Sequence, residues 1–485
     1  MSVLQTVSCP NCGAAHDLRN LAFIQVTCEF CESIYIWDTK GVEDTGKKAR
    51  LIPAVSGLAI GAEGRLHEKR FTVIGRASYA YGEFPEKSPA KNKDGESESR
   101  TSDAAASKAA ANDSAPESEP QKRRIRDLEI HGKWDEWFIE LETDERLWLS
   151  EDMGRLIEER ALPAPAELSV LRTGERFEFE GETFVLRETG TAFCIGTEGD
   201  LPFQVLPEDS YPFADATSLS GKRFLTLELD QDEETGDAFL YAGKRLKKDE
   251  IQYEKADYDK DALEGKSINC PSCGSPNNPL GESRSVLTIV CPSCGEGIDI
   301  SRETALALGR VEEKLAKVFS FPLGARGVLK GVEWTITGRI RYEYKTGPYD
   351  GWSLEYLLFN HAEGYRWLSQ SDEGRFLLGG PVDFAPGKSL FSVKESGKKV
   401  KIRKEKYTLM ESGELTVRYV DGALPWRARL EEKVRYAEAE APPYVFTEEA
   451  AMPGEDGGEI EYFYSKKISG EKVKSAFGVS SPPAS

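Results

Sequence analysis

The chain has 485 residues. At about 100–200 residues per domain, this length predicts two to four domains rather than one compact core. Acidic residues outnumber basic ones by 83 to 63, which gives a net charge of −20 and argues against a dedicated nucleic-acid-binding protein. Hydrophobic residues make up 39% of the chain, which contains 44 glycines and only 4 methionines. This composition favours cores built from strands and turns.

The first residues, MSVLQTVSCPNC, contain no basic segment followed by an apolar stretch, so no secretory signal is expected. No run of about 18 apolar residues occurs, so we expect no transmembrane helix. Eight of the nine cysteines fall in C-x-x-C pairs. In an acidic chain without a leader, such pairs indicate metal binding rather than disulfides, and we expect a cytoplasmic protein.

The chain begins with a module of two C-x-x-C pairs, and a second module of this kind lies near residue 270. Fifteen residues separate the pairs in the first module and seventeen in the second, which is the spacing of zinc ribbons. Four thiolates complete a tetrahedral shell, so we predict two structural zinc ions and no open catalytic position. The predicted ligands are Cys9, Cys12, Cys28, Cys31, Cys270, Cys273, Cys291 and Cys294.

Several residues in or near these motifs allow more than one interpretation. His16 could substitute for a ligand, but Asn277 stands there in the second module, so we interpret it as a strand residue near the site. Unpaired Cys194 is interpreted as a small buried apolar residue. Phe30 lies between the second pair of cysteines, where the second module has Ser293. Phe30 either meets a partner or packs on its own β region, and the sequence leaves both open.

The two modules open two copies of one unit. CPNCG at Cys9 recurs as CPSCG at Cys270, an offset of 261. The second pair of cysteines, Cys28 and Cys31, recurs as Cys291 and Cys294 at an offset of 263, which then holds without a gap to Phe71–Tyr81, recurring as Trp334–Tyr344. Both segments place apolar residues at every second position, which is typical of a half-buried antiparallel strand.

Farther along, the offset between the copies falls. We match Trp137 and Glu140 with Trp352 and Glu355 at an offset of 215, and from Gly190 onward the offset is 223. Glu140 and Glu355 could line a groove. Arg76 and Arg339, on the polar face of the repeated strand, are candidate ionic partners for them.

Pro85–Arg124 accounts for the drop in offset. It contains no Val, Ile, Leu, Met or aromatic residue, so it cannot bury enough apolar surface to offset its ordering entropy. We predict a disordered insertion at a hairpin tip. One further segment, Glu303–Val318, has a helical composition, but its counterpart in the first copy is a poor helix former, so any helix should be short or absent.

The predicted fold class is mainly β, with two tandem units that each consist of a four-cysteine zinc ribbon followed by small antiparallel β barrel or sandwich domains. The predicted parts are zinc ribbon 1 (1–40), β domain 1 (50–165, with the disordered insertion 85–124), the second β part of unit 1 (166–262), zinc ribbon 2 (263–302), β domain 2 (318–385) and the second β part of unit 2 (386–478).

The β regions resemble a bacterial family known as domain of unknown function 4178. The resemblance rests on G-x-x-G-x-L-x(5)-T-x-x-G-R at Gly61–Arg76 and Gly324–Arg339, and on WSLEY at Trp352, RWLS at Arg366 and DGALPW at Asp421. It implies a CPxC ribbon joined to a β domain, with no established activity. It also implies genes beside those for polyamine synthesis and membrane-stress proteins, and hence an assembly or adaptor role.

The sequence therefore favours a non-enzymatic zinc-binding adaptor with an unidentified protein partner, through which it could associate peripherally with a membrane. One alternative is a nucleic-acid-associated ribbon protein, supported only by the basic run Lys122–Arg126 and opposed by the net charge. Another is an enzyme with an unrecognised carboxylate site, for which we find no nucleotide-binding glycine motif and no histidine shared by both copies.

Overall fold

The computed structural model describes most of the chain. The described residues are 5–18, 25–38, 41–48, 56–83, 128–152, 154–163, 172–207, 209–229, 238–255, 268–277, 286–300, 306–310, 317–346, 349–360, 363–426, 429–452 and 459–478. The predicted insertion 85–124 and the basic run 122–126 lie outside the described residues.

The first unit contains an eight-stranded antiparallel barrel. Its strands follow one another in the order β7-β8-β9-β10-β15-β14-β13-β12, and β12 pairs with β7 to close the ring. Closure leaves these strands without a free edge. Their bounds are β7 (Lys69–Glu83), β8 (Glu129–Leu141), β9 (Arg146–Asp152), β10 (Arg155–Pro163), β12 (Glu182–Leu201), β13 (Ser210–Ser218), β14 (Phe224–Leu229) and β15 (Ala238–Arg245).

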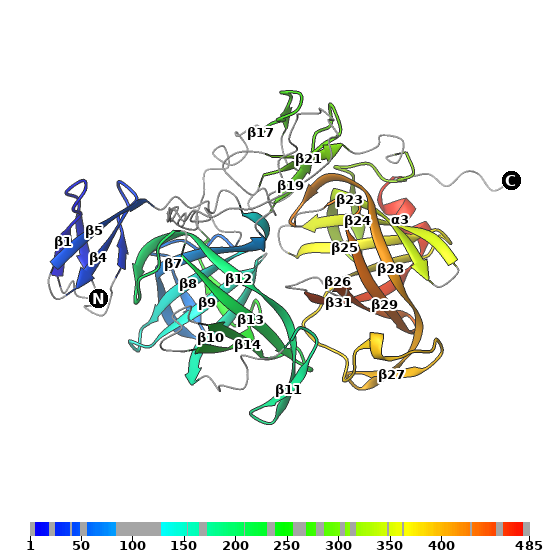
Figure 1. Cartoon of the computed structure of the whole chain (residues 1–485), viewed down its shortest axis with the longest axis horizontal. Helices are drawn as coiled ribbons and strands as arrows, with labels where there is room; N and C mark the ends of the chain where they lie inside the picture. Colours follow the sequence, from blue (N-terminus) through cyan, green and yellow to red (C-terminus); the bar gives the residue numbers. More distant parts are fainter. Residues whose placement is uncertain are drawn as a thin grey trace, which may run out of the picture.

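The second unit repeats this barrel, and the two barrels lie side by side in Figure 1. The order is β23-β24-β25-β26-β31-β30-β29-β28, and β28 closes onto β23. The mainly β fold and its duplication are thus confirmed. The bounds are β23 (Val332–Thr346), β24 (Tyr349–Asn360), β25 (Gly364–Ser371), β26 (Phe376–Pro381), β28 (Glu405–Leu424), β29 (Lys433–Ala441), β30 (Tyr444–Ala451) and β31 (Ile460–Ile468).

Each barrel is assembled from two four-stranded meanders. In the first unit, the residues expected as β domain 1 (50–165) supply β7–β10, and those expected as the second β part (166–262) supply β12–β15. The ranges 318–385 and 386–478 divide the second barrel in the same way. The two β parts of a unit therefore share one barrel rather than forming two.

The cysteine modules are small sheets joined to the barrel of their own unit. In the first, β3 pairs with the end of β12, where Val26 lies opposite Asp200. In the second, β19 pairs with the end of β28, where Thr288 lies opposite Leu424. The module strands are β1 (Gln5–Ser8), β2 (Ala15–Leu18), β3 (Gln25–Thr27), β4 (Ser33–Asp38), β5 (Gly41–Lys48), β17 (Ile268–Asn269), β18 (Pro276–Asn277), β19 (Thr288–Val290), β20 (Glu296–Asp299) and β21 (Leu306–Arg310).

The expectation that any helix in Glu303–Val318 would be short or absent agrees with the structure, in which Leu306–Arg310 forms strand β21. β21 pairs with β20, as β5 pairs with β4 in the first unit. The hydrogen bonds that an adjacent strand offers outweigh the helix propensity of Leu306, Ala307 and Leu308, since propensities differ by only a few tenths of a kcal/mol per residue.

Short strands and helices lie beside both barrels. In the first unit, β16 pairs with β6 beside β7. In the second, the helix α3 contacts β22, which holds the place of β6. The hairpin partners β11 and β27 extend β12 and β28. The bounds are β6 (Glu63–Leu66), β11 (Arg176–Phe179), β16 (Ile251–Tyr253), β22 (Arg326–Leu329), β27 (Lys399–Ile402), the 3₁₀ helix η3 (Leu390–Ser392) and α3 (Gly470–Ala476).

Register between the strands corrects one part of the sequence match. Trp137 lies opposite Arg76, but the residue opposite Arg339 is Tyr356, not Trp352. The offset along β8 and β24 is therefore 219, and the counterpart of Glu355 is Glu136 rather than Glu140. The residues around Trp137 and Trp352 are similar in sequence, but they do not occupy equivalent positions in the two barrels. In a sheet, equivalent positions are determined by cross-strand pairing rather than by local sequence similarity.

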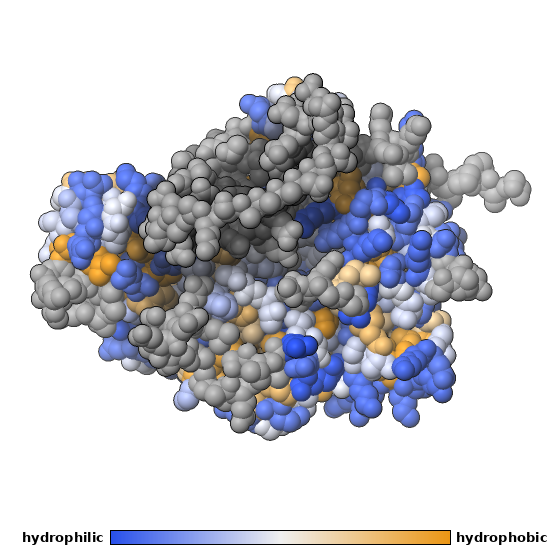
Figure 2. All heavy atoms as spheres, viewed as in Figure 1, coloured by the Kyte–Doolittle hydropathy of each residue, from blue (hydrophilic) through white to orange (hydrophobic). Residues whose placement is uncertain are grey.

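The cores lie at equivalent places in the two units. Phe71 and Trp334, at matching positions of β7 and β23, are 2% and 5% exposed. On the face shown in Figure 2, hydrophilic side chains dominate the described surface of the second barrel. None of the described helices is long and apolar enough to cross a membrane.

Candidate metal centres and the polar barrels

Each C-x-x-C pair is shaped into a knuckle by backbone hydrogen bonds. In the first module, Gly13 N donates to Cys9 O at 2.9 Å and Glu32 N donates to Cys28 O at 2.9 Å. Gly13 has φ of 75° and Glu32 has φ of 61°, both in the left-handed region. Gly13 adopts it freely, whereas Glu32 carries a Cβ that disfavours it. These turns bring both thiols of each pair to the same side.

The four sulfur atoms of the first module converge on one point. Cys9 Sγ lies 3.6 Å from Cys31 Sγ, and Cys12 Sγ lies 3.7 Å from Cys28 Sγ. These distances exclude disulfides, whose S–S bond is about 2.05 Å. Four ligands at about 2.3 Å from a tetrahedral ion would lie about 3.8 Å apart. The cluster therefore fits a metal ion with four thiolate ligands.

The second module repeats this geometry. Cys270 Sγ and Cys294 Sγ are 3.7 Å apart, as are Cys273 Sγ and Cys291 Sγ. In each module all four sulfur atoms lie within 4.8 Å of one another. Gly274 and Gly295 have φ of 75° and 72°, as expected of knuckle glycines. The structure thus brings together all eight predicted ligands, as two groups that could each hold a metal ion.

His16 and Cys194 lie outside these groups. His16 Nε2 lies 2.8 Å from Asp200 Oδ1, at the junction between the first module and β12. Gln25 strengthens this junction, because its amide donates to Thr197 Oγ1 and accepts from Val205 N. Cys194 is fully buried in the barrel, and burial raises the pKa of its thiol to about 12.

Phe30 stands out on the first module, because 70% of its surface is exposed. It occupies the tip of the second knuckle, between Cys28 and Cys31. Of the two open interpretations, the structure agrees with a side chain that does not pack on its own β region.

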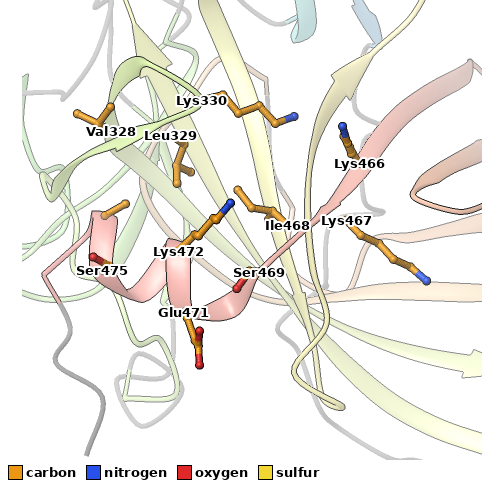
Figure 3. A pocket seen from close by; sticks show the side chains of 11 residues that line it. Val328, Leu329, Lys330, Lys466, Lys467, Ile468, Ser469, Glu471, Lys472 and Ser475 are labelled. Atoms are coloured by element: carbon orange, nitrogen blue, oxygen red, sulfur yellow. The ribbon is translucent and has the colours of Figure 1, made fainter.

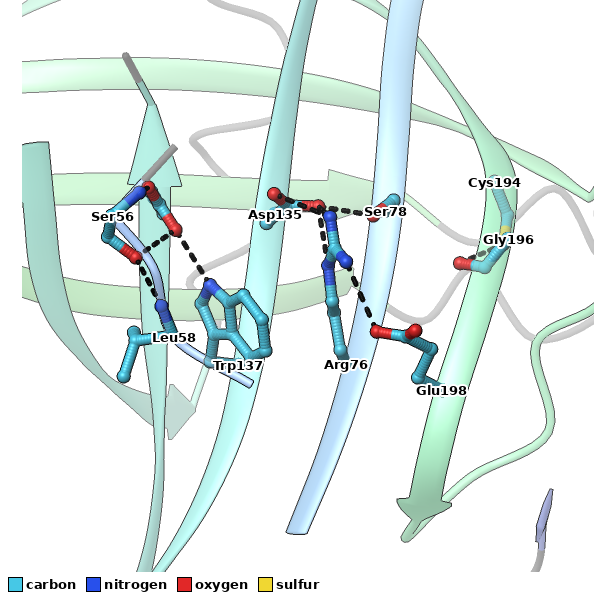
Figure 4. Close-up of polar contacts among 10 residues, drawn as sticks. Ser56, Leu58, Arg76, Ser78, Asp135, Trp137, Cys194, Gly196 and Glu198 are labelled. Atoms are coloured by element: carbon cyan, nitrogen blue, oxygen red, sulfur yellow. Dashed lines mark hydrogen bonds and ion pairs between the residues drawn. The ribbon is translucent and has the colours of Figure 1, made fainter. Parts of the chain in front are cut away.

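Arg76 and Arg339 bind acids other than those expected. Arg76, only 3% exposed, donates from Nε and Nη2 to the Asp135 carboxylate at 3.0 Å and from Nη1 to Glu198 at 3.1 Å (Figure 4). Arg339 pairs with Asp421, which is the counterpart of Glu198. The duplicated ion pair thus joins β7 to β12 and β23 to β28, which strengthens the seam that closes each barrel.

Glu140 and Glu355 have different surroundings. Glu140 accepts from Arg146 on the neighbouring strand at 2.9 Å. Glu355 instead alternates with Leu354 and Tyr356 on β24, and burial raises its pKa to about 7. Glu355 therefore has the raised pKa expected of a carboxyl group enclosed by the barrel.

The family comparison agrees with this duplicated architecture. The model for domain of unknown function 4178 matches residues 121–248 and 322–470, which together make up more than half of the chain. The chain belongs to this family. No curated protein and no solved structure matches it.

Each of the two matches to domain of unknown function 4178 coincides with most of one barrel. The second match covers β23, but the first begins after β7, which is the equivalent strand. The structure shows that β7 nevertheless belongs to the first barrel, because it pairs with both β8 and β12.

A basic pocket of about 630 Å³ lies in the second copy of the family domain (Figure 3). Its described lining comes from β22, the end of β31 and α3, and includes Lys330, Lys466, Lys467 and Lys472 with one acid, Glu471. Burial and the charge of Lys466 lower the pKa of Lys330. With a single acid, this lining offers no carboxylate pair for the enzymatic alternative.

Sequence reasoning missed the acids of the barrel interior, which include Glu136, Asp215 and Glu228. Burial raises the pKa of Glu136 to about 7 and that of Asp215 to about 6. The signal that could have found them is duplication, because Glu355, Glu438 and Glu449 occupy the equivalent positions. The incorrect offset of 215 hid the match between Glu136 and Glu355.

Proposed function

We propose that the chain is a non-enzymatic adaptor in which each ribbon holds one structural zinc ion and the first ribbon contacts a protein partner. The observation that carries the proposal is the pairing of a four-thiolate cluster with an exposed aromatic side chain on its knuckle. Thiolates are ligands that zinc prefers, and a closed shell leaves no position for water or substrate.

The role of the metal in this proposal is to fix the knuckles. The modules have short strands and small cores, so the free energy of metal binding would supply much of their folding free energy. Reduced cysteines are required for this role. That requirement fits the cytoplasm, where thiols are kept reduced, and we propose that location.

The partner surface in this proposal centres on Phe30. An aromatic side chain that is 70% exposed on a rigid turn loses little conformational entropy on binding and buries a large apolar area. We therefore propose a protein partner with an apolar pocket for this side chain.

The test combines metal content with partner capture. Elemental analysis of gently purified protein should give about two zinc ions per chain. Phe30→Ser should keep this content and recover less of the partner that wild type captures from native cells. Phe239→Ser is the matched control, because Phe239 is 54% exposed but lies on β15.

Two outcomes contradict the proposal. Iron, or a single ion per chain, would remove the zinc assignment. Equal partner recovery by wild type and Phe30→Ser at equal zinc content would remove the ribbon tip from the interface. A gel shift that persists at high salt would favour the nucleic-acid alternative instead, because non-specific contacts weaken as salt rises.

A further inference from the structure

Cross-strand pairing identifies the residues that line the interior of the first barrel. Residues directly opposite each other in a sheet share a face. Glu136 lies opposite Ala77, Glu159 opposite Trp148, and Glu228 opposite Phe213. This face is the inner one, because the ring centroids of Trp134 on β8 and Phe213 on β13 are 5.7 Å apart although two strands separate β8 from β13.

Four acidic side chains point into this interior from four different strands. They are Glu136 on β8, Glu159 on β10, Asp215 on β13 and Glu228 on β14. Burial raises the pKa of all four, and their mutual repulsion raises those of Glu136, Glu159 and Glu228 further. An enclosed cluster of like charges is costly to ionise unless a cation joins it.

Glu159 gives a second, independent indication that the barrel interior binds a ligand. It is only 9% exposed, and within the described part of the chain its carboxylate has no hydrogen-bond donor or ion-pair partner. It points inward, because it lies opposite Trp148, which in turn lies opposite Phe138 on the face of β8 that carries Glu136. A buried carboxyl without a partner is uncommon, since such groups are normally paired or bonded.

Aromatic rings form the rest of the wall. The rings of Tyr79 and Trp134 are stacked 5.4 Å apart, and Tyr211 meets Tyr79 edge-on at 5.5 Å. Trp148, directly opposite Glu159, packs 4.7 Å from Phe138 and 5.5 Å from Phe203. Aromatic faces attract cations through their quadrupole, and they suit organic ammonium ions in particular.

The interior also has room between these side chains. Glu136, Trp148, Asp215 and Glu228 each keep part of their accessible surface although they face inward. The carboxylates are too widely spaced for one small ion, because the only described groups of three or more ligands within 4.8 Å of one another are the two cysteine clusters. The space and spacing therefore favour an organic cation over a bare metal ion.

The second barrel is the natural comparison. Its counterparts of Glu136, Asp215 and Glu228 are Glu355, Glu438 and Glu449, so the acidic interior is duplicated. There, however, Glu438 already accepts from Arg375 at 2.9 Å. The counterpart of Glu159 is Gly379. The second barrel thus has an internal cation and lacks the unpaired carboxylate.

We propose that the interior of the first barrel binds a small organic ammonium ion, held by Glu159 beside the aromatic wall that includes Trp148 and neutralised by Glu136, Asp215 and Glu228. This site goes beyond the proposed adaptor role and does not depend on it.

The other charged groups that face this interior lie toward its ends. Asp152 and Arg155 pair with each other, and Arg155 also approaches Asp383 of the second unit. Arg245, exposed on β15, pairs with Asp383 as well. Among the described residues, the remaining inward titratable groups are Tyr79, Tyr81, Glu188, Cys194, Tyr211 and Tyr241, and burial raises the pKa of each. Both arginines are thus held by acids outside the cluster.

The test is calorimetric titration of the full chain with choline, and with 3,3-dimethylbutan-1-ol, which has the same shape without the charge. Choline should bind and the neutral alcohol should not. Because choline does not titrate and the carboxyls must ionise to hold it, affinity should rise about tenfold from pH 6.0 to pH 8.5. Binding of both compounds with equal affinity, or of neither, would overturn the proposal.

Variants distinguish this site from a general acidic surface. Glu159→Gln should weaken choline binding at least about tenfold, and Trp148→Leu should do the same without changing net charge. Glu145→Gln, on the exposed outer surface, should bind as wild type does. Unchanged affinity in Glu159→Gln, with a native circular dichroism spectrum, would place binding elsewhere and reject the site.

Discussion

Glu32 and Gly295 occupy the same position in the two ribbons, and both have left-handed backbone, with φ of 61° and 72°. A non-glycine residue in this region costs roughly 1–2 kcal/mol, because its Cβ crowds the following carbonyl. Glu32→Gly should therefore stabilise the first ribbon by about 1 kcal/mol. The measurement is the chelator concentration needed to remove metal from that ribbon.

The reciprocal change is the control. Gly295→Glu should weaken the second ribbon by a similar amount, for the same steric reason. A Glu32→Gly protein that loses metal more readily than wild type would show that Glu32 has a stabilising contact that outweighs its backbone strain.

The ion pair of Arg76 should be among those whose removal most lowers the stability of the first barrel. Arg76→Leu would leave Asp135 and Glu198 without their cation, and Asp135 is only 16% exposed. Breaking a buried pair by removing one partner costs roughly 3–5 kcal/mol. Urea denaturation should show a loss of this size in the unfolding free energy of the first unit.

An exposed pair provides the comparison. Lys69 and Glu145 are 3.4 Å apart, with 47% and 36% of their side chains exposed. Lys69→Ala should cost less than about 1 kcal/mol, because solvent screens the pair. Equal losses for Arg76→Leu and Lys69→Ala would mean that the buried pair contributes no more than a surface pair.

At the scale of the elements, hairpin β7–β8 determines how the insertion is tolerated. Glu83 and Glu129 lie opposite each other, so the strand ends on either side of the insertion are adjacent. In the second unit, Thr346 lies opposite Tyr349 across a tight connection. Deleting Pro85–Arg124 should leave barrel stability unchanged or raise it by no more than about 2 kcal/mol, because a shorter loop costs less entropy to close.

Thermal denaturation of the deletion variant checks this prediction, and limited proteolysis complements it. Wild type should be cut first within 85–124, and the deletion variant should resist the same protease. A large drop in melting temperature on deletion would show that the insertion contributes structure to the barrel.

At the scale of the whole molecule, the enclosed acids should make stability depend on pH. Burial raises the pKa of Glu136, Glu151, Glu355 and Glu461 to about 7 and that of Asp215 to about 6. In the unfolded chain, the pKa of each of these groups would return to about 4. The folded protein therefore binds more protons than the unfolded chain at intermediate pH.

The direction of the effect follows from this difference. The stabilisation is complete below about pH 4 for these groups and is lost as pH rises through about 6 to 7, where they must ionise inside the fold. The melting temperature should fall as pH rises from 5 to 8. Glu355→Gln should flatten this dependence, since it removes one titrating group. A melting temperature that rises over this range would contradict the burial of these acids.

Local patterns in the sequence determined the metal clusters and much of the fold. Two residues between cysteines restrict both thiols to one knuckle, so Cys9–Cys31 and Cys270–Cys294 could be assigned without a structure. Alternation along Phe71–Tyr81 and Trp334–Tyr344 predicted the repeated strand, because side chains of a strand alternate between faces. The gapless offset of 263 fixed the duplication of β6 and β7 as β22 and β23.

Only the tertiary structure decided which residues of different strands face each other. The match of Glu140 with Glu355 was wrong, because the register of β24 on β23 is fixed by pairing over the whole hairpin, and Glu136 is the true counterpart. Leu306–Arg310 became a strand because β20 offers it hydrogen bonds. The acidic interior appeared only on closure, which brings carboxyls from β8, β10, β13 and β14 into one enclosed space that no local spacing encodes.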